Sequence, residues 1–136
     1  MKTTSKIIVL EEWYTPEMCQ KNPDAIFVFG DNMVGHGKGG QAIIRDEPNA
    51  FGIPTKVAPD NHWSSFMKDR IEEIDAVRVA ILKLMELRDQ GKTIIFPADG
   101  LGTGLAKMGE KSPVLYKWMN EVLYTQFGVE YGEMKS

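Results

Sequence analysis

The feature that most constrains the fold is a repeated pattern, in which a short run of β-branched and aromatic residues leads into a G-x-G-x-G segment. The run AIFVF leads to the segment at 35–39, and the run TIIF leads to the segment at 100–104. Glycine loses more backbone freedom on folding than any other residue, so such clusters indicate positive φ angles or a close approach to the backbone. The pattern predicts two tight turns at which a ligand or another part of the chain comes close to the backbone.

Short apolar runs predict the strands. They indicate strands buried on both faces at 6–10, 25–30 and 93–97. A weaker extended segment covers 50–56, where Pro54 restricts it to a sheet edge or a strand end. Parallel pairing is expected because helical segments separate these runs.

Three- and four-residue spacing of apolar side chains predicts the helices. One helix is expected over 69–90, with Asp69 and Glu72 as a capping box, and another over 112–127. A shorter helix is expected near 39–44. Strands alternating with helices predict one α/β domain over residues 1–136, with helices on both faces of a mainly parallel sheet and a tail that frays from about residue 129.

Composition excludes several classes of function. The 136 residues are 43% hydrophobic and have a formal net charge of −3, which argues against a broad basic face for nucleic acid. Cys19 is the only cysteine, so neither an internal disulfide nor a zinc site with four thiolate ligands can form. No other metal-ligand spacing appears, and no metal or cofactor is expected. The sequence has no signal-peptide or membrane-length apolar segment, so we expect a soluble cytoplasmic protein without membrane partners.

The two glycine segments predict a phosphate site. Ligands of open α/β sheets bind beyond the carboxyl ends of the strands, where backbone N–H groups and helix N-termini converge on phosphate oxygens. A Walker A loop is excluded because Gly39 and Gly40 follow Lys38 where a Ser or Thr is required. The dinucleotide spacing G-x-G-x-x-G is matched, but Asp60 lies in a connecting loop rather than at a strand end.

Two segments of the chain resemble macro domains. DAIFVFGDNMVGHGKGGQAI is similar to their first glycine loop and TIIFPADGLGTGLA to their second, so the resemblance covers about residues 6–125. Similar small macro-like proteins occur in tailed bacteriophages, where the host cytoplasm would be the location. The resemblance implies a three-layer α/β/α sandwich with a mainly parallel, mixed sheet. It also implies a cleft for ADP-ribose or a related NAD-derived nucleotide.

The resemblance assigns roles to particular residues. Asn32 matches the residue that contacts the distal ribose, and Glu11 or Glu12 falls where the family recognises the adenine amino group. The expected ligand-binding residues are Glu12, Asn32, Gly35, His36, Gly37, Lys38, Gly39, Gly40, Gly100, Leu101, Gly102, Thr103 and Gly104.

The sequence also departs from the family pattern at positions that matter for hydrolysis. Gly40 stands where the hydrolytic members have a catalytic Asp, and Leu105 stands near the aromatic residue that packs on the distal ribose. Candidate catalytic residues are Asn32, Asp31 and Asp99. His36 also lies beside a glycine segment, and Lys38 is placed to reach a phosphate or to act as a nucleophile.

Polar residues beside these corners also have structural interpretations. Asp31 and Asn32 are residue types that cap turns through their own side chains, and Asp99 is placed to bind backbone N–H groups of its loop. Three hypotheses follow: a nucleotide-binding domain with ADP-ribosyl hydrolase activity, a non-catalytic nucleotide reader or sponge, and a partner-binding protein without a ligand, such as an inhibitor.

Overall fold

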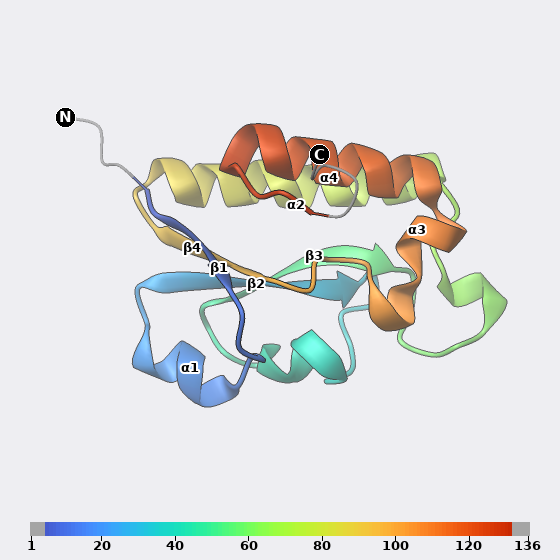
Figure 1. Cartoon of the computed structure of the whole chain (residues 1–136). Coiled ribbons are helices and arrows are strands. Elements are labelled where there is room, and N and C mark those ends of the chain that lie inside the picture. Colours follow the sequence, from blue (N-terminus) through green and yellow to red (C-terminus); the bar gives the residue numbers. More distant parts are fainter. Residues whose placement is uncertain (1–4, 132–136) are drawn as a thin grey trace.

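The computed structural model describes residues 5–131, which form a four-stranded sheet with helices on both of its faces (Figure 1). The strands are β1 (Ile7–Leu10), β2 (Ala25–Asn32), β3 (Ala50–Lys56) and β4 (Thr93–Pro97), in the spatial order β1-β4-β2-β3. All neighbouring strands are parallel, and antiparallel pairing among the described residues is limited to one bridge between Lys56 and Phe66. The sheet is therefore parallel throughout rather than mixed, and β3 lies at an edge as Pro54 predicts.

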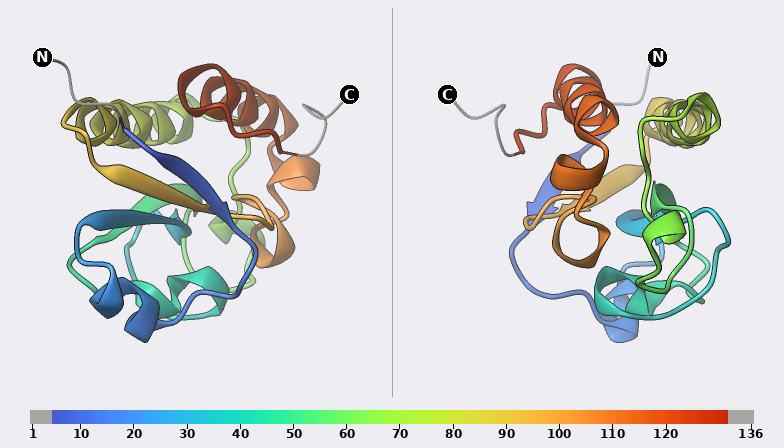
Figure 2. Two further views of the ribbon diagram at one scale, coloured as in Figure 1. Left: turned by 60° about the vertical axis from the view of Figure 1, so that its left-hand side comes forward. Right: turned by 90° about the vertical axis from the view of Figure 1, so that its right-hand side faces the viewer.

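The longer helices lie on one face of the sheet and the shorter ones on the other. Figures 1 and 2 show α2 (Ile71–Asp89) and α4 (Pro113–Phe127) side by side over one face, with α1 (Pro16–Lys21) and the 3-10 helix η1 (Gly40–Ile44) beneath the other. The remaining helical turns are η2 (Trp63–Ser65), η3 (Gly104–Ala106) and α3 (Met108–Lys111). The three predicted helices are confirmed, although the segment near 39–44 is a 3-10 helix.

Burial of the central strands follows from the two-residue period of their side chains. Along β2, Val28 faces the layer of α2 and α4, whereas Phe27 and Phe29 face the layer of α1 and η1. Both faces of β2 and β4 are covered, which explains their continuous apolar sequences. The same prediction is wrong for β1, where Val9 is 46% exposed because β1 is an edge strand.

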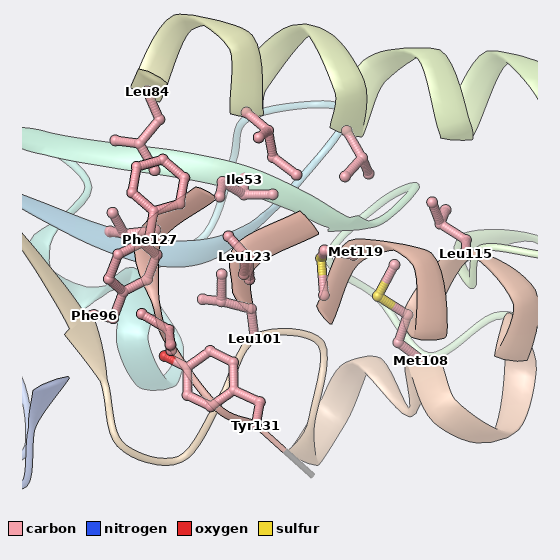
Figure 3. Close-up of a cluster of buried hydrophobic side chains, with 14 of the residues drawn as sticks. Ile53, Leu84, Phe96, Leu101, Met108, Leu115, Met119, Leu123, Phe127 and Tyr131 are labelled. Carbon is pink, nitrogen blue, oxygen red and sulfur yellow. The ribbon is translucent and has the colours of Figure 1, made fainter. Parts of the chain in front are cut away.

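The larger core lies between the sheet and the α2–α4 layer (Figure 3). The rings of Phe96 and Phe127 pack at 5.4 Å between centroids, and Leu101 and Tyr131 close the same cluster beneath the second glycine segment. The expectation of a frayed tail from about residue 129 does not hold for Val129 and Tyr131, which are buried. The later residues of the tail lie outside the described range.

The predicted cap of the helix over 69–90 is wrong. The helix begins at Ile71, and the side chain of Glu73 accepts hydrogen bonds from the N–H groups of Lys68 and Arg70. Asp69 instead binds the start of α4, where its carboxylate accepts from the N–H of Leu115 at 2.7 Å. An Asp two residues before a helix is a plausible cap for that helix in the sequence. The fold instead brings the start of α4 beside Asp69, so Asp69 caps α4.

Candidate functional site

The two glycine segments meet because they follow the two central strands. Loop 1 (residues 33–39) follows β2 and loop 2 (residues 98–103) follows β4. These strands pair only where residues 25–27 face residues 93–95, and beyond that point they diverge. A cavity of about 370 Å³ opens at this end of the sheet, and residues of both loops line it. We call this cavity the cleft.

One side chain links loop 2 to β2, the strand that precedes loop 1. Gln41, in the first turn of η1, accepts a hydrogen bond from the N–H of Gly30 and donates one to the carbonyl of Gly100, both at 2.9 Å. A Cβ atom on Gly30 would lie 3.8 Å from the amide nitrogen of Gly102. The end of β2 and loop 2 are therefore in contact, and Gln41 fixes their separation.

The glycines of these corners have the backbone angles that their clustering predicts. The φ angles are positive at Gly35, Gly37, Gly40, Gly100, Gly102 and Gly104. Within residues 5–131, no protein acceptor binds the N–H groups of Gly37, Lys38 and Gly39 in loop 1 or of Gly102, Thr103 and Gly104 at loop 2 and the start of η3. Such runs of free amides in turns with positive φ are suited to binding anions.

Most of the predicted ligand-binding residues lie at the cleft. Those that line it are Asn32, His36, Gly37, Gly39, Gly40, Gly102, Thr103 and Gly104, and the catalytic candidates Asp31 and Asp99 line it as well. Glu12 lies beside it, in a small adjacent cavity whose lining shares Trp13, Gln41 and Asp99 with the cleft. Four predicted residues line neither cavity: Gly35, Lys38, Gly100 and Leu101. Leu101 is fully buried in the core (Figure 3) because loop 2 turns its side chain inward.

The Asn32 side chain organises loop 1. Its oxygen accepts from the N–H groups of Val34, Gly35 and His36, and its amide nitrogen donates to the carbonyl of His36 at 2.7 Å. These bonds match the turn-capping interpretation of an Asn after a strand. One hydrogen of the Asn32 amide group is not used in the loop.

Asp31 is also engaged by the protein. Its carboxylate accepts from the N–H of Asn32 at 2.7 Å and forms an ion pair with Arg45 at 2.6 Å. The carboxylate also packs over Gly52 of β3, where a Cβ atom would collide with it. Asp31 therefore supports the loop, and its charge is neutralised within the protein.

Asp99 differs from Asp31. It is exposed, it lines both cavities, and no hydrogen bond or ion pair to its carboxylate occurs among residues 5–131. Its main-chain carbonyl accepts from the Thr103 hydroxyl, which shapes loop 2. Tyr131 supports the loop from below by donating to the carbonyl of Pro97, and its pKa is raised by burial and then by the nearby Asp99 charge. Asp99 is the candidate carboxylate that the described residues leave free.

Comparison with known proteins places the chain in a family. A model of a family of unknown function, DUF7831, matches residues 9–122, a range that includes both loops. The chain belongs to this family. No curated protein and no solved structure matches it.

Several cleft residues of this DUF7831 chain were not predicted from the sequence, among them Gln41, Arg45 and Trp13. Gln41 and Arg45 follow the glycine segment within η1 and at its end, and their side chains bind loop carbonyls. Trp13 follows β1 and is 74% exposed, although it lines both cavities. Its only sequence signal is a tryptophan three residues after the end of a strand, and this position does not predict that the ring reaches a site formed by other strands.

Lys56 is an unexpected buried cation that lines the cleft of this DUF7831 chain. Its ammonium group donates to the carbonyl of Asp60 at 2.7 Å and lies 4.7 Å from the centre of the Phe66 ring. Burial lowers the pKa of Lys56, and the negative charge of Asp60 partly offsets this effect.

The described residues contain neither a candidate metal site nor a candidate membrane-spanning helix. No group of three His, Cys, Asp or Glu side chains among them lies close enough to hold a metal ion. None of the helices between residues 5 and 131 has the length and apolar character needed to cross a lipid bilayer.

Proposed function

We propose that this chain binds ADP-ribose or a related NAD-derived nucleotide between loops 1 and 2, within a macro-like, three-layer α/β/α fold. The observation that supports this most strongly is that two G-x-G-x-G corners, 65 residues apart in the sequence, line one cleft, where Gln41 links Gly30 of β2 to Gly100 of the second corner. The cleft volume of about 370 Å³ lies within the usual range for small-molecule sites. We also propose a cytoplasmic location, which is the host cytoplasm for a phage-encoded chain.

Main-chain amides are suited to the pyrophosphate of such a ligand. The free N–H groups of the cleft-lining Gly37 and Gly39 belong to loop 1, and those of the cleft-lining Gly102 and Thr103 belong to loop 2. A pyrophosphate placed between the loops would accept from both sets, and hydrogen bonds to a charged acceptor are about twice as strong as neutral ones. Two loops that face one cleft are better explained by two linked phosphates than by a single one.

Neighbouring side chains suit the remaining parts of a nucleotide. Trp13 and Leu105 line the cleft and are 74% and 71% exposed, so each offers apolar surface to a base or a ribose. Glu12 lies in the adjacent small cavity, where its carboxylate would accept from an exocyclic amino group. The free N–H of Asn32 would donate to a ribose hydroxyl. We propose no protein or nucleic-acid partner beyond this small ligand.

Substitution at Gly39 tests the proposal, because the backbone at this position accepts a side chain without strain. Gly39 has a φ angle of −78°, lines the cleft, and has open space where the Cβ atom of another residue would lie. We expect Gly39→Glu to weaken ADP-ribose binding by at least about tenfold, because it places a negative charge beside the phosphates. Gly39→Gln adds nearly the same volume without the charge and is the matched control.

Titration calorimetry of the folded protein measures these affinities. The proposal predicts heat with ADP-ribose, less affinity with AMP, and a larger loss for Gly39→Glu than for Gly39→Gln. If the wild-type protein is folded but gives no heat with millimolar ADP-ribose, the partner-binding hypothesis replaces this one. Equal affinities for the two variants would show that the phosphates lie elsewhere.

A second candidate function is hydrolysis of an ADP-ribosyl linkage, and the free carboxylate of Asp99 favours it. Of the three candidate catalytic residues, Asp31 is paired with Arg45 and Asn32 is bound within loop 1, so Asp99 is the one whose side chain is free to activate a water. Binding without turnover remains our primary proposal. Incubation with an ADP-ribosylated protein separates the two: turnover that Asp99→Asn abolishes supports hydrolysis, and an unchanged substrate supports a reader or sponge.

A further inference from the structure

The side chain of Arg45 binds loop 1 by donating to two main-chain carbonyl groups of the loop. Its Nε donates to the carbonyl of Gly37 at 2.7 Å, and one terminal nitrogen lies 3.2 Å from the carbonyl of His36. The same terminal nitrogen forms the 2.6 Å ion pair with Asp31. The guanidinium also lies 5.5 Å from the centre of the Phe29 ring. Arg45 is therefore fixed on four sides, and its side chain is only 15% exposed.

These bonds determine where the neighbouring N–H groups point. All described peptide bonds are trans, and in a trans peptide the carbonyl and the following N–H point in opposite directions. Because Arg45 binds the carbonyls of His36 and Gly37, the N–H groups of Gly37 and Lys38 point away from the guanidinium. Both N–H groups lack a protein acceptor within residues 5–131. Arg45 thus orients two successive amides without occupying them.

The ion pair with Asp31 decides how Arg45 can act on a ligand. Both side chains are largely buried, at 15% and 18% exposure, and Asp31 is fixed in turn by the N–H of Asn32. The positive charge of Arg45 is therefore already compensated, and moving the guanidinium to a ligand would leave Asp31 unpaired. An unpaired carboxylate in that position is costly.

We propose that Arg45 is a positioning residue, which together with Asp31 pre-orders the N–H groups of loop 1, in particular that of the cleft-lining Gly37, for an anionic group of the ligand. This inference rests on the proposed function, because it assigns the Gly37 N–H to the phosphate of the nucleotide. It adds that loop 1 recognises the phosphate by main-chain hydrogen bonds and not by an arginine–phosphate ion pair. The ligand class is consequently a phosphate ester or pyrophosphate held in a pre-formed turn.

Asp31→Asn distinguishes this role from direct contact between Arg45 and the ligand. If Arg45 positions the loop, removing its partner loosens the guanidinium, and the affinity for ADP-ribose falls by about tenfold. If Arg45 binds the phosphate itself, removing the competing carboxylate increases the affinity. The two mechanisms therefore predict changes of opposite sign. Arg45→Gln weakens binding under both and serves to show that Arg45 is involved.

The matched control is Asp46→Asn. Asp46 forms an exposed ion pair with Lys38 of the same loop, so this variant changes the net charge equally but leaves the contacts of Arg45 in place. We expect its affinity to stay within about twofold of the wild-type value. Thermal unfolding of each variant confirms that it is folded at the temperature of the titration.

The results separate this inference from the proposed function. Wild-type binding of ADP-ribose, weakened by Asp31→Asn but not by Asp46→Asn, supports both. Wild-type binding that Asp31→Asn strengthens or leaves unchanged overturns the inference and retains the function. If the wild type binds neither ADP-ribose nor inorganic pyrophosphate, the proposed function fails. Nuclear magnetic resonance relaxation of the Gly37 and Lys38 amides then tests the positioning role: Arg45→Gln must increase their mobility, and unchanged mobility overturns it.

Discussion

At the scale of single residues, Asp69 joins two helices that are far apart in the sequence. Its carboxylate accepts from the N–H groups of Leu115 and Val114 and from the hydroxyl of Ser112. Asn tolerates the positive φ angle of residue 69. Its NH₂ group, however, would replace a carboxylate oxygen that accepts a hydrogen bond, and would therefore face another donor. We expect Asp69→Asn to lower the free energy of unfolding by about 1 kcal/mol, measured by urea denaturation at pH 7.

The control for this variant is Asp75→Asn, which removes an exposed carboxylate on α2 that pairs only with Arg78. Its effect should stay below about 0.5 kcal/mol. Equal effects of the two substitutions would contradict the capping role of Asp69.

The same carboxylate predicts a pH dependence. Burial alone would raise the pKa of Asp69, but the hydrogen bonds from Leu115, Ser112 and Val114 outweigh it and hold the pKa below its ordinary 3.8. A lowered folded-state pKa stabilises the protein above the unfolded-state value, and this stabilisation is lost as the pH falls through the folded-state pKa. The stability difference between wild type and Asp69→Asn should therefore shrink below about pH 4. A difference that stays constant in urea titrations at pH 7 and at lower pH would contradict this.

Sequence reasoning at this scale identified polar residues near the corners but not what they bind. Asp31, Asn32 and Asp99 all follow a strand and precede glycines, so their local sequences look alike. The structure shows Asp31 paired with Arg45, Asn32 bound within its own loop, and Asp99 free. The difference depends on Arg45, which lies 14 residues after Asp31 and reaches it only when η1 packs beneath the sheet.

At the scale of secondary-structure elements, Tyr14 closes the point where the central strands diverge. Its hydroxyl is buried and lies 2.8 Å from the carbonyl of Val28 in β2 and 3.3 Å from that of Ile95 in β4. Burial raises the pKa of Tyr14, so the hydroxyl stays protonated and donates. We expect Tyr14→Phe to destabilise the protein by about 1–3 kcal/mol, because the buried carbonyls lose their donor.

Urea denaturation measures this effect, and Tyr124→Phe is the control. Tyr124 lies on α4 and is 41% exposed, so the loss of its hydroxyl should change stability by less than about 0.5 kcal/mol. A Tyr14→Phe protein as stable as the control would show that the hydroxyl is not needed where β2 and β4 part.

Gln41 links β2 to loop 2. The hydrogen bonds of its side-chain amide to Gly30 and Gly100 set the distance between that strand and that loop. Gln41→Met keeps the length of the side chain but removes both bonds, so we expect ADP-ribose affinity to fall by about tenfold. Gln20→Met, which removes an exposed amide on α1 that binds Glu47, should bind as the wild type does in the same titration. Equal binding by both variants would contradict the role of Gln41.

The elements could be predicted from the sequence where a regular pattern sets them. The spacing of apolar residues and the residues at helix ends predicted α2, α4 and the four strands. Pro54 predicted that β3 lies at a sheet edge or ends there, and β3 is an edge strand. α1 and α3 have six and four residues, too few for a period to appear, although Thr15 and Pro16 form a recognisable helix start. The cap at Asp69 was assigned to the wrong helix because a capping pattern does not show which N-terminus will be nearby.

At the scale of the whole molecule, the cleft is a consequence of strand order. β2 and β4 are neighbours in the centre of the sheet, yet β2 continues to β3 at one edge and β4 pairs with β1 at the other. Such a switch point in an open parallel sheet is where ligands bind. The sequence predicted that both loops leave carboxyl ends of strands, but strand order depends on helix packing over both faces, which local patterns do not show.

The central claim is that loops 1 and 2 hold one pyrophosphate together. Its most direct test is a nuclear magnetic resonance titration of the ¹⁵N-labelled protein with ADP-ribose, in which the amides of Gly37 and Gly102 are followed separately. We expect both signals to shift and both curves to give the same Kd. Shifts confined to one loop, different Kd values for the two amides, or no shift at either would contradict it.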